Sequence, residues 1–255
     1  MDIVKVKNVT YAKYEEVLLR RDNLRKEAEE YHLQFIRVFG DLITESFKLK
    51  IECIKKKKMI AYCQRLANQG KEINSSALES FIEREMAEYR AELDAMLRDV
   101  KAVREAEAIT PMQLKKIKTI YYALVKLMHP DMHPELAGDE KLKDYWQRVV
   151  IAYTYNNLAE LEELDVLIRS YLEDRGAADA GVEIENIDEK IAQVEKEIDK
   201  IISTDPYLYK LLLADEREVE DRKQTYEDEI KSYTNYSAEL QEILDTFDIK
   251  EGLLS

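Results

Sequence analysis

Apolar residues recur at steps of three and four along the N-terminal part of the chain. The series over 14–63 has the spacing of a coiled-coil seam, which predicts a single helix of about fifty residues. Turn formers and a candidate N-cap follow over 68–76, and the same spacing resumes over 78–103. We therefore expect residues 1–107 to fold as an antiparallel hairpin of two long helices.

Residues 108–173 carry two further helical patterns, separated by a short polar loop. The first begins at Thr110-Pro111, an N-cap followed by proline at the first helical position, and it ends before His129-Pro130-Asp131. The loop continues over 132–138, where it contains proline and glycine, and the next helix starts near Asp139. A pair of helices joined by this loop is therefore expected in the middle of the chain.

A run of small residues, Gly-Ala-Ala-Asp-Ala-Gly, lies within 174–183 and predicts a flexible linker. Heptad spacing then returns over 184–201, is interrupted at Thr204-Asp205-Pro206, and resumes over 219–247. We expect residues 184–255 to form a second, acidic helical hairpin. The expected fold is all-α, with antiparallel coiled-coil hairpins on both sides of the central helical pair.

Composition agrees with long helices and an acidic surface. Only 6 glycines and 4 prolines occur in 255 residues, of which 36% are charged. The formal net charge is −14, and residues 174–255 hold 10 Lys plus Arg against 23 Asp plus Glu, a net of −13. Such a surface repels phosphate backbones, so no nucleic-acid partner is expected. The four consecutive lysines at 55–58 are interpreted as a solvated helical segment.

The sequence shows neither a membrane-spanning nor a secretory pattern. No apolar run approaches the roughly 18 residues that a membrane span requires, and the N-terminal residues lack the apolar core of a secretory signal. We expect a cytoplasmic protein with no membrane partner. Cys53 and Cys63 fall in one predicted helix, about 15 Å apart along its axis, which is too far for a disulfide. They are expected to be reduced core thiols.

The tripeptide His129-Pro130-Asp131 between two helices resembles the signature of the J-domain family. In that family a loop with this tripeptide joins an antiparallel helical pair and stimulates ATP hydrolysis by a DnaK-type chaperone. The resemblance covers residues 110–157 of 255. Apolar positions typical of the family also match, namely Tyr121 and Leu124 before the motif and Trp146, Val149 and Ala152-Tyr153 after it.

The resemblance implies that the tripeptide engages a partner and performs no chemistry on a substrate. Asp131 would be the acidic contact to a basic patch of a DnaK-type ATPase, His129 would shape the loop, and Pro130 would stiffen it. Pro130 also fixes its own φ angle and biases His129 away from helical geometry, which lowers the ordering cost of binding. We accordingly expect a co-chaperone or adaptor that is not an enzyme, needs no cofactor, and binds a client that no sequence motif identifies.

The helix before the motif departs from the family in its basic residues. Tyr122, Ala123 and Leu127 stand where lysine or arginine is common in J domains. Four lysines remain and are predicted to form a displaced basic face that contacts the partner: Lys115, Lys116, Lys118 and Lys126. The family's short first helix is not recognisable before Thr110, and we expect the end of the helix over 78–103 to take over its packing role.

Two other interpretations remain open. In the first, a degenerate J-like fold is only a spacer in a structural coiled-coil interaction protein, which includes a homodimer formed through the coiled coils. In the second, a metal ion binds the four candidate ligands of the loop: His129, Asp131, His133 and Glu135. A polar loop is favoured over a metal site, because the loop prolines exclude the helical two-histidine arrangement of metalloproteases. The sequence also lacks phosphate-binding loops, nucleophile elbows and Cys-x-x-Cys pairs.

Overall fold

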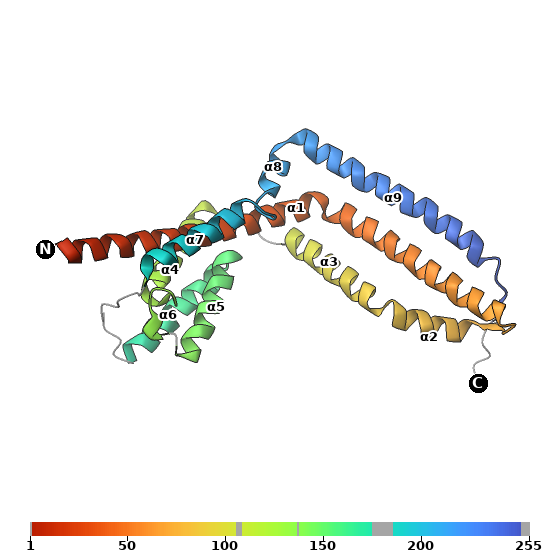
Figure 1. Ribbon diagram of the computed structural model, residues 1–255, viewed down its shortest axis with the longest axis horizontal. Coiled ribbons are helices and arrows are strands. Elements are labelled where there is room, and N and C mark those ends of the chain that lie inside the picture. The colour runs from red at the N-terminus through yellow and green to blue at the C-terminus, as the bar shows by residue number, and fades with distance from the viewer. Residues whose placement is uncertain (1, 106–108, 137, 175–185, 251–255) are drawn as a thin grey trace. The chain divides into compact units, whose positions relative to one another are not determined.

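The computed structural model describes residues 2–105, 109–136, 138–174 and 186–250, and the described residues are almost entirely helical (Figure 1). The all-α fold expected from the sequence is confirmed. The nine α-helices of this part of the chain are α1 Asp2–Asn68, α2 Ser75–Glu85, α3 Ala87–Glu105, α4 Pro111–Met128, α5 Glu140–Thr154, α6 Leu158–Asp174, α7 Ile187–Ile202, α8 Tyr209–Ala214 and α9 Glu216–Leu244. A 3-10 turn at Pro134–Leu136 and two short strands, β1 Ile73–Asn74 and β2 Ile249–Lys250, complete the described structure.

Two compact units are assembled from alternating stretches of the chain. Unit 1 contains Met1–His32 and Glu107–Lys210, and unit 2 contains Leu33–Ala106 and Leu211–Ser255. Helix α1 therefore begins in unit 1 and ends in unit 2. The sequence predicted consecutive domains, and this division is wrong, because each unit takes helices from both sides of the segment that belongs to the other.

The core of unit 1 brings the start of α1 against α4, α5, α6 and α7. Tyr14 and Leu18 of α1 are buried in the same apolar cluster as Leu124 of α4. α5 and α6 lie side by side as an antiparallel pair, with Arg148 of α5 bound to Glu160 of α6 (Figure 1). The heptad seam of α7 closes the cluster with three buried residues: Ile191, Val194 and Ile198.

The start of α1 therefore supplies the packing that we expected from the end of the helix over 78–103. That expectation is wrong, since α3 belongs to unit 2. The heptad pattern shows only that a helix has an apolar stripe, and it does not identify the partner of that stripe. Helix α1 is also longer than predicted, because it spans the 67 residues Asp2–Asn68.

Unit 2 contains the N-terminal hairpin that the sequence predicts. α1 runs antiparallel to α2 and α3, because residues later in α1 contact residues earlier in the second arm. Gly40 of α1 lies against Val100 of α3, and the ring centroid of Tyr62 of α1 lies 4.9 Å from that of Phe81 of α2. The second arm is divided at the buried Met86, where φ is −106° and ψ is 1°. β1 pairs in parallel with β2, which attaches the end of the described chain to this unit.

The two C-terminal helices do not form the predicted hairpin over 184–255. α7 belongs to unit 1 and α9 to unit 2, and each packs on α1. Ser46, Cys53 and Lys56 of α1 bond to successively later residues of α9, so the two helices run parallel; these partners are Glu229, Tyr233 and Ser237. The continuous α1 has a long apolar stripe against which both α7 and α9 pack. The apolar seam of each helix is buried there, so a hairpin between α7 and α9 is not needed to bury it.

Three further expectations concern single segments. Cys53 and Cys63 are buried free thiols, and burial raises the pKa of each, as expected of unreactive core cysteines. The linker predicted at 174–183 lies, after Asp174, outside the described residues. None of the helices in the described ranges has the length and apolar content that crossing a membrane would require.

Candidate functional site

The loop after α4 is positioned by well-defined signals at both ends of that helix. Thr110 and Gln113 form a reciprocal capping box, and Pro111 occupies the first turn, where it needs no donor. At the other end His129 leaves helical geometry, with φ −56° and ψ 127°, because the following Pro130 disfavours the helical conformation for the residue before it. The helix therefore ends at the motif.

His129 is an internal element of the loop and not a surface group. Its side chain is only 3% exposed, and its ring stands edge-on to Trp146 with 4.8 Å between centroids. Nδ1 accepts a hydrogen bond of 3.0 Å from the backbone N–H of Asp131, which places the proton of the neutral ring on Nε2. Burial lowers the pKa of His129 to about 4, against the opposing influence of Asp131, so the ring is neutral at physiological pH.

Further bonds close the loop into a tight turn. The backbone N–H groups of Met132 and His133 both donate to the carbonyl of His129, at 2.9 and 2.8 Å. Met132 is buried in the core of unit 1, and its own carbonyl accepts a bond of 3.3 Å from the Tyr11 hydroxyl of α1. The turn is therefore held from inside by packing and from the side by α1.

Asp131 extends outward from this turn. Its side chain is 47% exposed, and its carboxylate lies 4.0 Å from Nδ1 of His129, which carries no proton to donate. The loop thus combines a buried, fixed histidine with an accessible carboxylate. This arrangement suits recognition of a cationic partner group, since an exposed carboxylate on a rigid turn binds without further ordering.

The four candidate metal ligands do not converge. Nδ1 of His129 is occupied by the Asp131 backbone, and His133 places Nε2 2.7 Å from the Lys126 carbonyl and Nδ1 3.1 Å from Glu135 Oε1. Among the described residues, no group of three or more His, Cys, Asp or Glu side chains has a geometry that could hold a metal ion. His133 instead ties the loop back to the last turn of α4.

The predicted basic face is divided by ion pairs. All four lysines of α4 are exposed, but Lys116 pairs with Glu162 of α6 and Lys126 pairs with Glu15 of α1 at 2.9 Å. Lys115 and Lys118 line a pocket of about 450 Å³ that also contains Asn23, Lys26, Glu27, Glu30, Leu114, Thr119 and Tyr122. The structure therefore does not gather the four lysines into one unobstructed cationic surface.

A buried polar network fixes α1 behind the site. The hydroxyl of Tyr121 donates to Asp22 at 2.8 Å, and that of Tyr153 donates to Asn23 at 2.6 Å. The Tyr121 and Tyr153 rings stack with 3.7 Å between centroids. Lys26 is buried beside them and donates to the Tyr153 carbonyl at 2.6 Å, and burial lowers its pKa to about 8. These directional bonds fix the register of α1 on α4 and α5.

Tyr11, Tyr14 and Glu15 are site residues that the sequence analysis missed. All three belong to α1: Tyr11 donates to the Met132 carbonyl of the loop, Glu15 pairs with Lys126 at the end of α4, and Tyr14 is buried in the same cluster as Met132. The heptad pattern indicated that Tyr14 is buried, but it gave no information on what covers it. Asp131 is one of the charges that raise the pKa of Tyr14, to about 12, although burial is the main cause.

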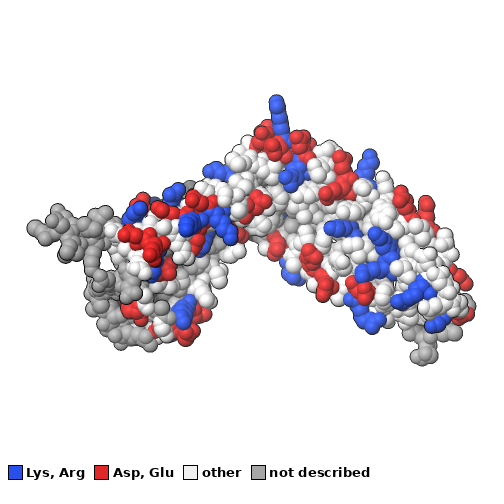
Figure 2. Space-filling view, viewed as in Figure 1, with Lys and Arg blue, Asp and Glu red and all other residues white. Residues whose placement is uncertain are grey.

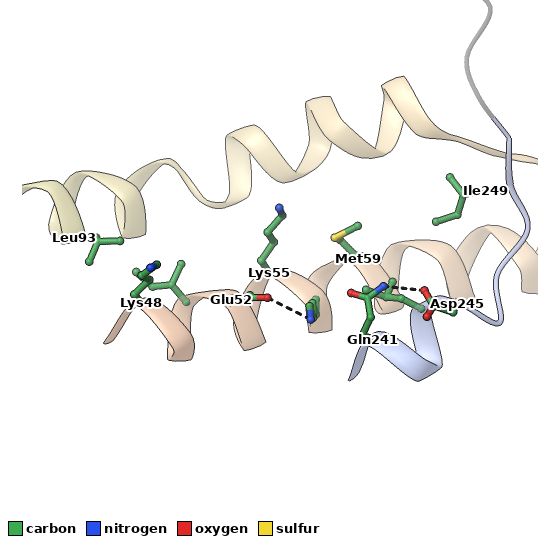
Figure 3. A pocket seen from close by; sticks show the side chains of 11 residues that line it. Lys48, Glu52, Lys55, Met59, Leu93, Gln241, Asp245 and Ile249 are labelled. Atoms are coloured by element: carbon green, nitrogen blue, oxygen red, sulfur yellow. Dashed lines mark hydrogen bonds and ion pairs between the residues drawn. The ribbon is translucent and has the colours of Figure 1, made fainter. Parts of the chain in front are cut away.

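A second candidate site lies in unit 2, in a groove beside α1 (Figure 3). It has a volume of about 500 Å³, with Met59, Leu93 and Ile249 supplying apolar surface. Two of its lysines are already compensated, since Lys56 pairs with Glu52 at 3.3 Å and Lys48 with Glu45 at 3.7 Å. Lys55 and Asp245 also line the groove, so its lining carries both signs of charge. Charge therefore selects no ligand for this groove, and the loop of unit 1 is the stronger site.

The surface charge likewise does not single out a binding site for a charged ligand. On the face drawn in Figure 2, basic and acidic side chains are interspersed and form no large patch of one sign.

No family model, curated protein or solved structure matches this chain. The functional conclusion therefore depends on the loop and its surroundings.

Proposed function

We propose that this protein is a J-domain-like co-chaperone or adaptor that engages a DnaK-type ATPase chaperone through the loop His129-Pro130-Asp131. The observation that carries the proposal is the pairing of a buried and an exposed residue in that loop. The buried His129 holds the turn in place, and the carboxylate of Asp131 is exposed to solvent. One or both units would then bind a client protein or a second copy of the chain.

The surroundings of the loop support this proposal physically. Trp146 packs on His129, and the pairs Tyr121 with Trp146 and Tyr121 with Tyr153 join α4 to α5. The positions that match the J-domain pattern therefore form the support of the loop. A loop held in this way loses little conformational freedom on binding, which favours recognition through a small surface.

The test is the ATP turnover of a DnaK-type chaperone with the wild type and with Asp131→Asn. We expect stimulation by the wild type and a loss of at least about tenfold in the variant, because truncating a charged contact at an interface costs about 1.4 kcal/mol or more. Asp131 is half exposed, so the variant should keep the wild-type melting temperature. Asp144→Asn, which alters an exposed carboxylate on α5, is the matched control and should stimulate fully.

A chaperone whose turnover is unchanged by the wild-type protein would contradict the proposal. Equal stimulation by the wild type and Asp131→Asn would also contradict it, because binding would then not depend on the loop.

The second candidate is a structural interaction protein in which the J-like fold is a spacer between coiled coils. The pairing of Lys116 and Lys126 with glutamates favours it, since the remaining cationic surface of α4 is small. In that case Asp131→Asn would retain every partner in pull-downs from native cells, and recovery of a DnaK-type chaperone by the wild type alone would exclude it.

A further inference from the structure

One face of α4 leads directly to the loop. Lys115, Lys118, Tyr122 and Lys126 are spaced by three and four residues, so they lie on a single stripe of the helix. Lys126 stands in the last turn of α4, and its carbonyl lies 2.7 Å from Nε2 of His133. It is thus the lysine of this stripe nearest the loop.

Glu15 of α1 covers the charge of Lys126. Its carboxylate lies 2.9 Å from the lysine amine, and its side chain is 20% exposed where that of Lys126 is 62% exposed. Tyr14 and Leu18, on either side of it in α1, are buried in the core of unit 1. Because these neighbours fix α1, the backbone of Glu15 is held beside Lys126.

We infer that Glu15 is a specificity-determining residue of the docking face, because it neutralises Lys126 and sets the charge shown beside the loop. This inference rests on the proposed function. The end of α4 near Asp131 then presents net negative charge. The cationic part of the stripe is confined to Lys118 and Lys115, which lie about 12 and 17 Å from Lys126 along the helix axis. The fitting partner surface is cationic opposite Asp131 and anionic only opposite these two lysines.

Removing the carboxylate should weaken engagement of this partner surface. In Glu15→Gln the charge of Lys126 is no longer compensated, so a positive charge beside Asp131 repels the cationic partner surface. The pair is largely exposed on the lysine side, so we expect an effect of about two- to fivefold, greatest at low salt. Lys126→Gln leaves the Glu15 carboxylate uncompensated, a charge change of the same size and opposite sign, so it should strengthen engagement by a similar factor.

The experiment is a double-mutant cycle on the full chain, measured as the concentration that gives half-maximal stimulation of a DnaK-type ATPase. We expect Glu15→Gln to raise this concentration by about two- to fivefold, and we expect the double variant with Lys126→Gln, in which the net charge of the pair is restored to zero, to match the wild type. The maximal stimulation should stay constant. Glu162→Gln, which frees Lys116 on another side of α4, is the matched control and should have no effect.

Each outcome decides a different point. An unchanged or lowered half-maximal concentration in Glu15→Gln overturns the inference while leaving the proposed function in place. The same result follows if the double variant keeps the full effect of Glu15→Gln, because Glu15 would then act without Lys126. Absence of stimulation by the wild type overturns the proposed function and the inference together.

Discussion

The role of His129 in this chain follows from its burial and not from its reactivity. The imidazole fills the space between the end of α4 and Trp146. Its Nδ1 accepts the hydrogen bond from the Asp131 backbone N–H, as a backbone carbonyl would otherwise do. A glutamine could supply an acceptor but not the flat apolar face that meets the indole. The residue is therefore a structural part of the turn, while the contact to a partner falls to Asp131.

The buried His129 should make folding sensitive to acid. Its pKa is lowered to about 4 by burial, with Asp131 and Asp22 opposing the shift and Arg21 and His133 adding to it. In the unfolded chain the ring titrates near 6.5. Between these values the unfolded state binds a proton that the folded state does not, so the free energy of unfolding falls as pH is lowered from about 6.5 to 4.

We expect this contribution to reach at most about 3 kcal/mol at the acid end of the window. Chemical denaturation at pH 7 and at pH 4.5 measures it, with His129→Gln as the reference that lacks the titrating ring. The difference between the two proteins should shrink toward low pH. A difference that stays constant over the window would show that the ring does not resist protonation.

At the scale of single elements, α1 is the helix on which most of the described structure depends. It pairs antiparallel with α3, parallel with α9, and in unit 1 it packs against α4, α5, α6 and α7. Gly40 marks the point where α1 and α3 approach closely, since a Cβ atom there would lie 2.8 Å from Cγ2 of Val100. Valine is stiff at χ1, so its methyl group cannot swing aside.

Gly40→Ala should therefore destabilise unit 2. The better helix propensity of alanine contributes about 0.5–1 kcal/mol, but overpacking against Val100 costs about 1–3 kcal/mol. Denaturant unfolding measures the net loss. Gly138→Ala is the control, because no atom lies within 4 Å of a Cβ there. A Gly40→Ala protein as stable as the wild type would mean that the helices separate at little cost.

The elements also show where a local pattern was sufficient. The N-cap at Thr110 and the stop at Pro130 were both predicted from sequence, because caps and prolines act within one helical turn. The lysine run at 55–58 was only partly described by its pattern. Lys55 and Lys57 are exposed, but Lys56 donates to the Ser237 carbonyl and Lys58 pairs with Glu85. Those partners lie far along the chain.

At the scale of the whole molecule, the two units have separate apolar clusters. Leu124 lies in the cluster of unit 1 and Ile82 in that of unit 2. Leu124→Ala should cost about 2–5 kcal/mol by leaving a cavity, and the loss should appear mainly as faster hydrogen exchange in α4, α5 and α6. Ile82→Ala should instead cause faster hydrogen exchange mainly in α2 and α3.

Hydrogen exchange followed by mass spectrometry distinguishes these outcomes, with each variant serving as the control for the other. If either substitution loosened all helices equally, the continuous α1 would be transmitting instability and the clusters would not act as separate cores.

The sequence by itself determined the helical fold, both ends of α4, the start of α5, and the motif with its supporting aromatic residues. These follow from spacing, capping and proline geometry, which are properties of neighbouring residues. The break between α5 and α6 was not predicted, because the apolar spacing continues from Tyr153 through Leu161 to Ile168. Only the tertiary structure decided that α7 and α9 pair with α1 and not with each other, and that Tyr11 and Glu15 lie beside the loop. An apolar heptad stripe fits any other such stripe, so the choice of partner depends on the packing of the complete set of helices.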